Sequence, residues 1–197
     1  ADGRRPGVFY VNTHDLPSRP RYLTEALYLH AALPGHHHRV SLAQEAEDLP
    51  RFRRFASDMA FAEGWALYAE ALGPDLGLYA DPHGAFGALV NEMGCAVHLV
   101  VDTGLHVKGW TRAQAIDYFR ANTAIGEADI AAQVDGQIAR PGQALACKVG
   151  ELKIQELRRR AQAALGPRFD IRAFHAEVVE SGSLPLAVLE ARIDRWI

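Results

Sequence analysis

The sequence contains few cysteines, no long uninterrupted apolar run and no excess of either charge. Only two of its 197 residues are cysteines, Cys95 and Cys147, which excludes a disulfide-rich scaffold and leaves the redox state of this pair open. Because 21 basic residues face 24 acidic ones, the formal net charge is −3, which argues against a nucleic-acid-binding protein. Polar residues interrupt every apolar stretch, so we expect neither a transmembrane segment nor a membrane partner.

The first residues, ADGRRPG, lack an initiator methionine and an apolar signal core. We therefore expect a processed form, a trimmed chain or a fragment, and we favour a cytoplasmic location. Hydrophobic residues make up 49% of the chain, which is enough to bury a sizeable core at this length. Residues 1–197 are accordingly expected to form a single domain.

Helical patterns dominate the chain. Residues 7–13, GVFYVNT, are rich in β-branched and aromatic side chains and predict one short strand. A helix that opens at Pro20 is interrupted at Pro34-Gly35, and a long helix is predicted from about residue 50 to 72. Further helix boundaries are predicted at Asp81-Pro82, Thr111 with Gln114, Pro141, Gly166-Pro167, Asp170 and Pro185. The predicted fold class is all-α, a multi-helix domain with one N-terminal edge strand.

The stretch LHAALPGHHH, residues 29–38, places four histidines around the Pro34-Gly35 break. A helical zinc site commonly uses His-Glu-x-x-His, with the two histidines one turn apart. Here His30 and His36 are six residues apart, and a bulge at Pro34 would bring His36 to the second ligand position. On a regular helix His37 would lie about 10 Å from His30, too far to share one ion. We prefer His36 to His37, and the spacing leaves the choice open.

A third ligand is predicted on the apolar stretch FAEGWALYAE. Glu63 lies inside this stretch, and a buried carboxylate needs a metal or another cation as its partner. The next residue, Gly64, permits a close approach of a neighbouring segment. The alternative interpretation is that the histidines lie on the surface and that Glu63 forms a salt bridge with Arg53 or Arg54.

A second cluster consists of Cys95 and His98, three residues apart on a predicted helix, with Cys147 as a further member. This spacing can share a metal ion. A cysteine in a helix more often behaves as a small buried apolar residue, and we favour that interpretation.

Four motifs together resemble a known family. They are HAALPGHH, EGWALYAE, VVDTGLHVKGWTRAQAIDYF and RPGQALACKVGELKIQELR, and they resemble the bacterial family catalogued as domain of unknown function 885. Its members resemble zinc metallopeptidases of the gluzincin type. The resemblance runs from about Gly7 to the C-terminus. Members are usually much longer, so the chain resembles the C-terminal catalytic part of a two-lobed protein, and the missing N-terminal portion is an expected partner.

The resemblance implies a zinc site whose ligands are His30, His36 and Glu63. It implies that Asp102 orients a histidine ligand from outside the site and that His106 takes part in catalysis. The strand at residues 7–13 would lie along the cleft and pair with an extended substrate. Substrate contacts are expected from Tyr10, Asn12, His98, Arg140 and Gln143.

The chain departs from the family pattern at one decisive position. Ala31 stands where the pattern His-Glu-x-x-Pro-Gly-His-His has the glutamate that activates water as general base. Such a base contributes roughly 10²–10⁴-fold in rate, so we expect impaired hydrolysis with metal binding retained.

Other departures replace Arg, Trp, Tyr, Glu or Gln of the pattern in the expected cleft, while caps, glycines and apolar stripes are kept. They fall at Arg39, Gly94, Cys95, His98, Gln133, Gly136, Gln137, Arg140 and Cys147. This contrast indicates that the scaffold is retained and the cleft remodelled. We expect a zinc-metallopeptidase-like domain that acts on peptides or small amides. The alternatives are a non-catalytic descendant that binds a peptide or small ligand, and an enzyme redirected to non-hydrolytic chemistry.

Overall fold

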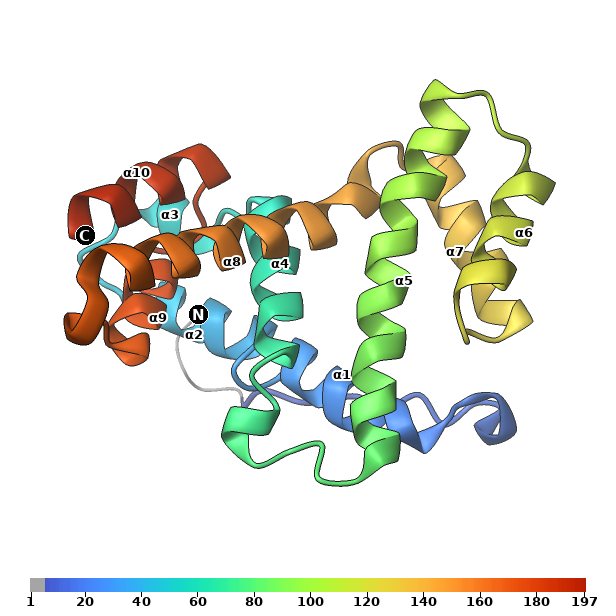
Figure 1. Cartoon of the computed structure of the whole chain (residues 1–197), viewed down its shortest axis with the longest axis horizontal. Coiled ribbons are helices and arrows are strands. Elements are labelled where there is room, and N and C mark those ends of the chain that lie inside the picture. The colour runs from blue at the N-terminus through green and yellow to red at the C-terminus, as the bar shows by residue number, and fades with distance from the viewer. Residues whose placement is uncertain (1–5) are drawn as a thin grey trace.

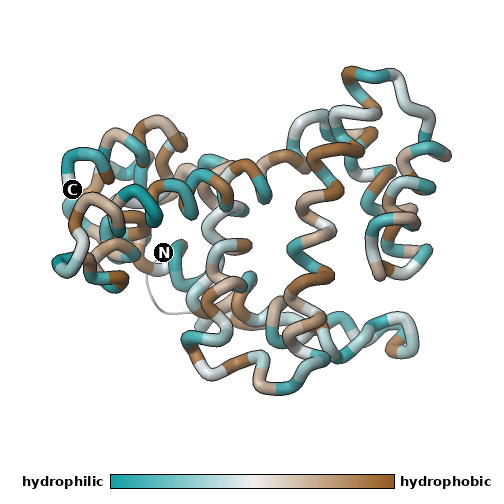
Figure 2. Tube along the Cα trace, viewed as in Figure 1, coloured by the Kyte–Doolittle hydropathy of each residue, from teal (hydrophilic) through white to brown (hydrophobic). Residues whose placement is uncertain are grey.

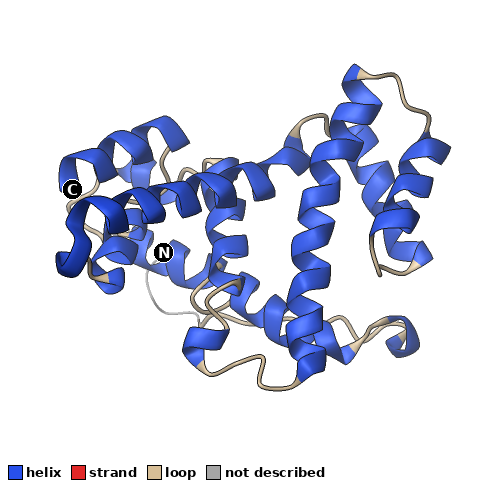
Figure 3. Cartoon of the chain, in the orientation of Figure 1, coloured by secondary structure: helices blue, strands red, loops and turns tan. Residues whose placement is uncertain are grey.

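A computed structural model describes residues 6–197, and every regular element in that range is a helix (Figures 1 and 3). The all-α prediction is confirmed. The α-helices are α1 (Thr24–Ala31), α2 (His36–Glu45), α3 (Arg51–Phe55), α4 (Met59–Glu70), α5 (Pro82–Val107), α6 (Arg112–Asn122), α7 (Glu127–Ala139), α8 (Ala146–Leu165), α9 (Ile171–Val179) and α10 (Leu186–Trp196). Short 3₁₀ helices are η1 (Leu16–Ser18), η2 (Arg21–Leu23), η3 (Pro74–Leu76), η4 (Gln143–Leu145) and η5 (Gly166–Arg168).

The predicted helix starts are largely confirmed by capping side chains. Asp81 accepts a hydrogen bond from the His83 amide at the start of α5. Asp170 accepts one from the Arg172 amide at the start of α9. Thr111 and Gln114 form a complete capping box at α6. Each cap satisfies an amide that the first helical turn leaves without a partner.

Three sequence predictions about the backbone are wrong. Residues 7–13 form no strand, because a strand needs a neighbour for its backbone hydrogen bonds and the described chain offers only helices. The predicted helix at residues 50–72 is divided into α3 and α4, because the Asp58 amide bonds Ser183 Oγ at 2.7 Å while the Asp58 side chain caps α4. Pro141 lies in a turn before η4, and α8 begins only at Ala146.

The larger hydrophobic core lies among α4, α8, α9 and α10, on the side of the molecule where the chain ends (Figure 1). Its largest fully buried side chains come from α4, α8, α9 and α10. They include Phe61, Trp65, Ile154, Leu157 and Phe174. Each such burial contributes about 1.5–3 kcal/mol to folding, so this core fixes the position of α4.

Helices α4 and α8 cross at a pair of glycines. A Cβ atom on Gly64 would lie 2.4 Å from the backbone of Gly150, and one on Gly150 would lie 1.8 Å from the Ala60 carbonyl oxygen. Only glycine fits at these two positions, as predicted for Gly64. The crossing therefore fixes the position of α4 relative to α8, and with it the position of Glu63, the neighbour of Gly64.

A second core is formed by α5, α6 and α7, on the opposite side of the molecule (Figure 1). Its fully buried members include Val101, Phe119 and Val134. Helix α5 contacts α1, α6, α7 and α8 and carries an apolar stretch along its length (Figure 2). By length and composition α5 could also cross a membrane, a test that core helices pass as well. The expectation of no transmembrane segment stays a prediction.

The two cores are joined by a disulfide bond between Cys95 on α5 and Cys147 on α8. Both cysteines are buried and pack with Leu67 of α4. The pair that the sequence left undecided is thus a covalent link between the two helical groups.

Candidate metal centre

The break between α1 and α2 brings two histidines together. Helix α1 ends at Ala31, and a Cβ on Gly35 would lie 1.9 Å from the carbonyl oxygen of His30, so only glycine permits this return of the chain. The indole of Trp65 donates a hydrogen bond of 2.8 Å to the Pro34 carbonyl and ties the break to α4. His36 therefore begins α2 with its ring 4.8 Å from that of His30.

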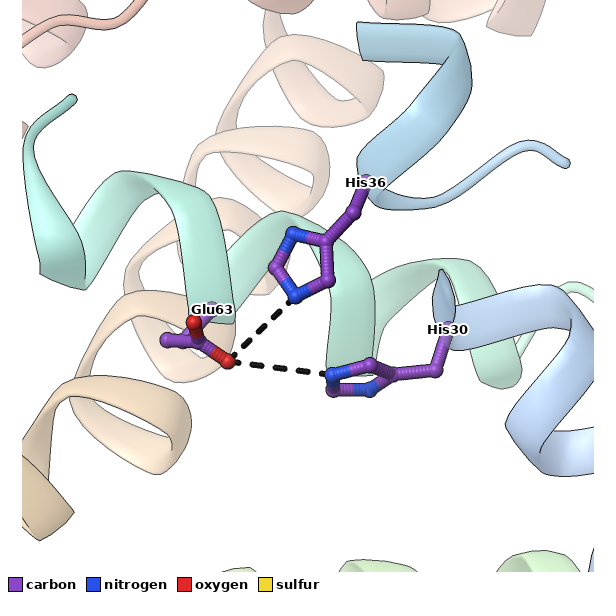
Figure 4. Close-up of side chains that lie close together, drawn as sticks. All are labelled: His30, His36 and Glu63. Carbon is purple, nitrogen blue, oxygen red and sulfur yellow. Dashed lines mark ion pairs between the residues drawn. The ribbon is translucent and has the colours of Figure 1, made fainter. Parts of the chain in front are cut away.

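Glu63 of α4 faces both rings from one side (Figure 4). Its Oε2 atom is 3.4 Å from Nε2 of His36 and 3.7 Å from Nε2 of His30. One ligand atom from each residue lies within 4.8 Å of the others. The structure thus brings together the three residues that the resemblance pointed to, with His36 rather than His37 in the cluster.

This arrangement fits a zinc ion. Zinc accepts imidazole nitrogen and carboxylate oxygen at about 2.0–2.1 Å, and two ligands of a tetrahedral zinc then lie about 3.4 Å apart. The distances from Glu63 to the two histidines are 3.4 and 3.7 Å. Three protein ligands also leave a fourth position free for a water or substrate atom.

A second carboxylate holds the first histidine from behind. Glu70 Oε1 lies 2.6 Å from Nδ1 of His30, and Asn91 of α5 donates to both Glu70 oxygens at 2.7 and 2.8 Å. The Glu70 side chain is almost fully buried. With its Nδ1 proton directed at Glu70, His30 presents the Nε2 lone pair to the cluster, as metal-binding histidines do.

The prediction that Asp102 plays this role is therefore wrong. Its carboxylate accepts the Gly142 amide at 3.1 Å and so caps the turn after α7. Sequence reasoning missed Glu70, although it follows Glu63 by seven residues, two turns of the same helix. That spacing is the signal that could have identified it.

The charges of the cluster are mutually dependent. Hydrogen bonds from His30 and His36 lower the pKa of Glu63 well below its usual range. Burial alone would lower the pKa of His30, but its hydrogen bonds to Glu63 and Glu70 outweigh burial and raise the pKa to about 9. Without a metal, a proton on the imidazole supplies the positive charge that the two carboxylates require.

A buried arginine lies near the cluster. Arg39 of α2 is 5% exposed, and its Nε has no hydrogen-bond partner among the described residues. Its guanidinium lies over the ring of Phe61, 5.7 Å from the centroid. Burial lowers the pKa of Arg39, and the charge of Glu63 partly offsets that effect. Arg39 thus adds positive charge beside the carboxylate that would bind the metal.

The cluster opens into a cavity of about 500 Å³ between α4, α5 and α7. His30 and Glu63 line it on one side. The remaining lining residues include Asn91, Cys95, His98, Asp129, Gln133, Gly136, Gln137, Arg140, Gln143 and Cys147. A cavity of this size accepts a ligand of several residues or a small amide.

The predicted substrate-binding residues divide into two groups. His98, Arg140 and Gln143 line the cavity. Tyr10 is 85% exposed and Asn12 accepts its hydrogen bond from the His14 amide, and neither lines the cavity. These two predictions depended on a strand along the cleft, and because that strand does not form they stay predictions without structural support.

The predicted catalytic role of His106 stays a prediction without structural support. Its Nε2 donates to the Gln137 carbonyl oxygen at 2.9 Å and so links α5 to α7, outside the residues that line the cavity. Ala31, the last residue of α1, follows His30 directly and carries no polar side-chain atom. The position expected for the general base therefore holds none.

The alternative salt bridges for Glu63 do not form. Arg53 donates to the Ser181 carbonyl, and Arg54 donates to the Gln44 carbonyl at 3.0 Å. The disulfide removes both thiolates from the suggested cysteine–histidine site, and His98 bonds Gln133 Oε1 at 2.8 Å instead. Within residues 6–197 the only cluster able to hold a metal ion is His30, His36 and Glu63.

Comparison with protein families matches residues 1–193 to the bacterial proteins of unknown function known as DUF885. The chain belongs to this family. A search of curated proteins finds no match.

Two solved structures resemble this DUF885 chain. One is of a Colwellia psychrerythraea protein provisionally named a lipoprotein, with 44% identity and a TM-score of 0.96 over 99% of this chain. The other, from Shewanella oneidensis, is provisionally named a lipoprotein of unknown function and shares 22% identity with a TM-score of 0.80 over 89% of this chain, a likeness of fold alone. The chain spans 34% and 32% of their respective lengths, about a third of each.

Proposed function

We propose that this DUF885 chain is a zinc-binding, metallopeptidase-like domain of the gluzincin type that acts on peptides or related amides, with hydrolysis weakened by Ala31. The observation that carries the proposal is the convergence of His30, His36 and Glu63 at distances suited to one zinc ion. A bound zinc supplies Lewis-acid chemistry toward an amide carbonyl.

The residues of the chain would have distinct roles in metal binding, ligand orientation and substrate binding. His30, His36 and Glu63 would hold the ion, and Glu70 with Asn91 would orient His30. The cavity residues on α5 and α7 would hold the substrate beside the ion and limit the water around it. Proton abstraction from water is the step left without a dedicated residue, because Ala31 has no carboxylate.

A second candidate function follows from that same absence. A chain with an intact metal cluster, an open cavity and no general base could bind a peptide or small ligand without turning it over. An enzyme redirected to non-hydrolytic chemistry is a third proposal, for which the cavity indicates no reaction.

Metal content together with peptide digestion separates these proposals. The purified 197-residue chain is expected to contain one zinc per molecule by elemental analysis, with zinc lost in His36→Ala and kept in His37→Ala. A peptide-library digest that is slow and abolished by a chelator supports the weakened hydrolase. Zinc with no cleavage supports the binding function. Less than a tenth of an equivalent of zinc, after incubation with excess ion, would refute the proposal.

We further propose that the chain is exported and not cytoplasmic. A buried disulfide persists in oxidising compartments, and the related Colwellia psychrerythraea protein, at 44% identity, is provisionally named a lipoprotein. Mass spectrometry of protein alkylated at the moment of cell lysis should recover Cys95 and Cys147 in one linked peptide. Alkylation of both thiols would contradict export.

Because the chain covers only about a third of each related structure, we also propose that the remaining portion in longer members contributes to the cavity. Exposed apolar side chains along α5 provide a surface for it, among them Phe86, Leu89 and Met93.

A further inference from the structure

The wall of the cavity formed by α7 contains a buried amide without a partner. Gln137 is 5% exposed and lines the cavity, and neither its side-chain nitrogen nor its side-chain oxygen has a hydrogen-bond partner in the described part of the chain. Leaving a buried donor and acceptor unpaired costs about 1–3 kcal/mol for each group. A turn of this side chain toward the cavity would let an amide of a bound ligand satisfy both, since that amide offers one acceptor and one donor.

A guanidinium lies one turn further along the same wall. The Nη2 atom of Arg140 is 3.1 Å from the position that a Cβ atom on Gly136 would occupy, so the arginine folds back over the space that the glycine leaves open. Both residues line the cavity. Arg140 forms no side-chain ion pair with any residue between 6 and 197, and its five N–H donors match a carboxylate in fork geometry.

The acidic groups of the cavity do not cancel this charge. Asp129 stands in the first turn of α7 and Arg140 follows its last turn, eleven residues later, which corresponds to about 16 Å along the helix. Glu63 is occupied by its contacts with His30 and His36. His98, which also lines the cavity, is directed at Gln133, and burial lowers its pKa and so favours its uncharged form.

We propose that the α7 wall recognises the C-terminal end of the ligand: Arg140 binds a free α-carboxylate and Gln137 binds the amide that precedes it. The substrate class is thus short peptides or N-acyl amino acids with an unblocked carboxyl terminus. This inference rests on the proposed function, because the cavity that it describes is the one beside the metal cluster. It identifies Arg140 and Gln137 as specificity-determining residues.

The test compares ligands that differ only at their C-terminus. The probes are an equimolar mixture of N-acetylated tripeptides with free carboxyl groups and the same mixture as C-terminal amides. Retention on the 197-residue chain is measured at 4 °C by ultrafiltration and mass spectrometry, with cleaved products counted with their parents. We expect the free acids to be retained at least about tenfold more strongly than the amides, since charge-assisted bidentate hydrogen bonds are about twice as strong as neutral ones.

Variants then assign the preference. Arg140→Gln should reduce it to less than twofold, Arg140→Lys should restore part of it, and Arg159→Gln, a change at an exposed arginine on α8, should leave it unchanged. Gln137→Leu should weaken the binding of acids and amides alike. Equal retention of acids and amides, retention of neither, or an unchanged preference in Arg140→Gln would overturn the inference.

The same experiment keeps the two proposals separate. Retention is measured with and without added zinc, and zinc content is measured independently by elemental analysis. A preference for free acids in a protein that binds no zinc would support the recognition by α7 while refuting the proposed metal function. Stoichiometric zinc without that preference would do the reverse.

Discussion

Nδ1 of His30 and Oε1 of Glu70 lie 2.6 Å apart, so the histidine that would bind the metal is held by a carboxylate two turns beyond Glu63 on the same helix. Asn91 occupies both oxygens of that carboxylate from α5. The orientation of one ring therefore depends on the relative positions of α1, α4 and α5. The first prediction concerns this relationship.

Replacing Glu70 with Gln should weaken zinc binding by about 10–100-fold, because partners behind a ligand histidine typically contribute that much. The new amide nitrogen would also face the Asn91 amide nitrogen, so one hydrogen bond to α5 is lost. Competition with a fluorescent chelator measures the zinc dissociation constant. Glu180→Gln, at an exposed position after α9, is the control. Unchanged affinity in Glu70→Gln would mean that His30 needs no such support.

Restoring a glutamate at position 31 should raise peptide hydrolysis by at least about 10²-fold, because it returns a general base to the residue after His30. Ala31→Gln adds the same bulk without a carboxylate and should give no gain. Initial rates on the peptide library measure the effect. If Ala31→Glu gains nothing, the other cleft changes, including Gly94, Cys95 and Gly136, also limit the reaction.

Arg39→Gln should tighten zinc binding by a few-fold to tenfold. The substitution removes a buried positive charge near Glu63. The repulsion between this charge and a bound zinc ion would amount to no more than a few kcal/mol. Isothermal titration with zinc measures the change, with the exposed Arg195→Gln as control. Weaker binding would show that Arg39 supports the cluster through its contact with Phe61 rather than opposing the metal.

Gly150→Ala should destabilise the fold by at least about 2 kcal/mol, which lowers Tm by roughly 4–8 °C at this chain length. The added methyl group would lie 1.8 Å from the Ala60 carbonyl and force α8 away from α4. Gly126→Ala is the matched control, since a Cβ there meets no atom within 4 Å. Calorimetry compares the two, and equal melting temperatures would refute the close crossing.

The fold should lose stability on mild acidification. Burial, with a contribution from the Arg158 charge, lowers the pKa of His175 to about 4, and its Nε2 lies 2.8 Å from Tyr68 Oη. Between pH 6.5 and 4, His175 binds a proton in the unfolded chain but stays neutral in the folded chain. The unfolding free energy therefore falls as pH falls through that window and levels off below it.

The expected loss is on the order of 1–3 kcal/mol, measured by urea unfolding at several pH values. His175→Asn should be less stable at pH 7 and should show a shallower slope from pH 6.5 to 4. The same slope in the variant as in the original chain would place the acid sensitivity elsewhere.

Much of the fold could be predicted from local chemistry. Caps at Asp81, Thr111 and Asp170 follow from short-range hydrogen bonding, and the sequence shows them directly. The helix break at Asp58 could not be predicted, because it depends on a contact with Ser183, 125 residues away. The residues 7–13 have strand-forming side chains but find no partner strand, which is a property of the whole fold.

The candidate site shows the same limit. The sequence pointed to His30, His36 and Glu63 through a resemblance and a helix break, and the structure places them together. The sequence pointed to Asp102 as the carboxylate that orients a histidine ligand, whereas Glu70 contacts His30. Both are acids in apolar helices, and only packing decides which one faces the ring. Pairing of Cys95 with Cys147 could not be foreseen, since it depends on how α5 meets α8.

The bond between Cys95 and Cys147 joins residues 52 positions apart and closes a ring of chain. Helices α6 and α7, and the whole cavity wall that carries Gln137 and Arg140, lie inside this ring. A protease that nicks the loop between α6 and α7 would therefore produce two polypeptides that still migrate together. They would separate on a denaturing gel only once a thiol reagent is added.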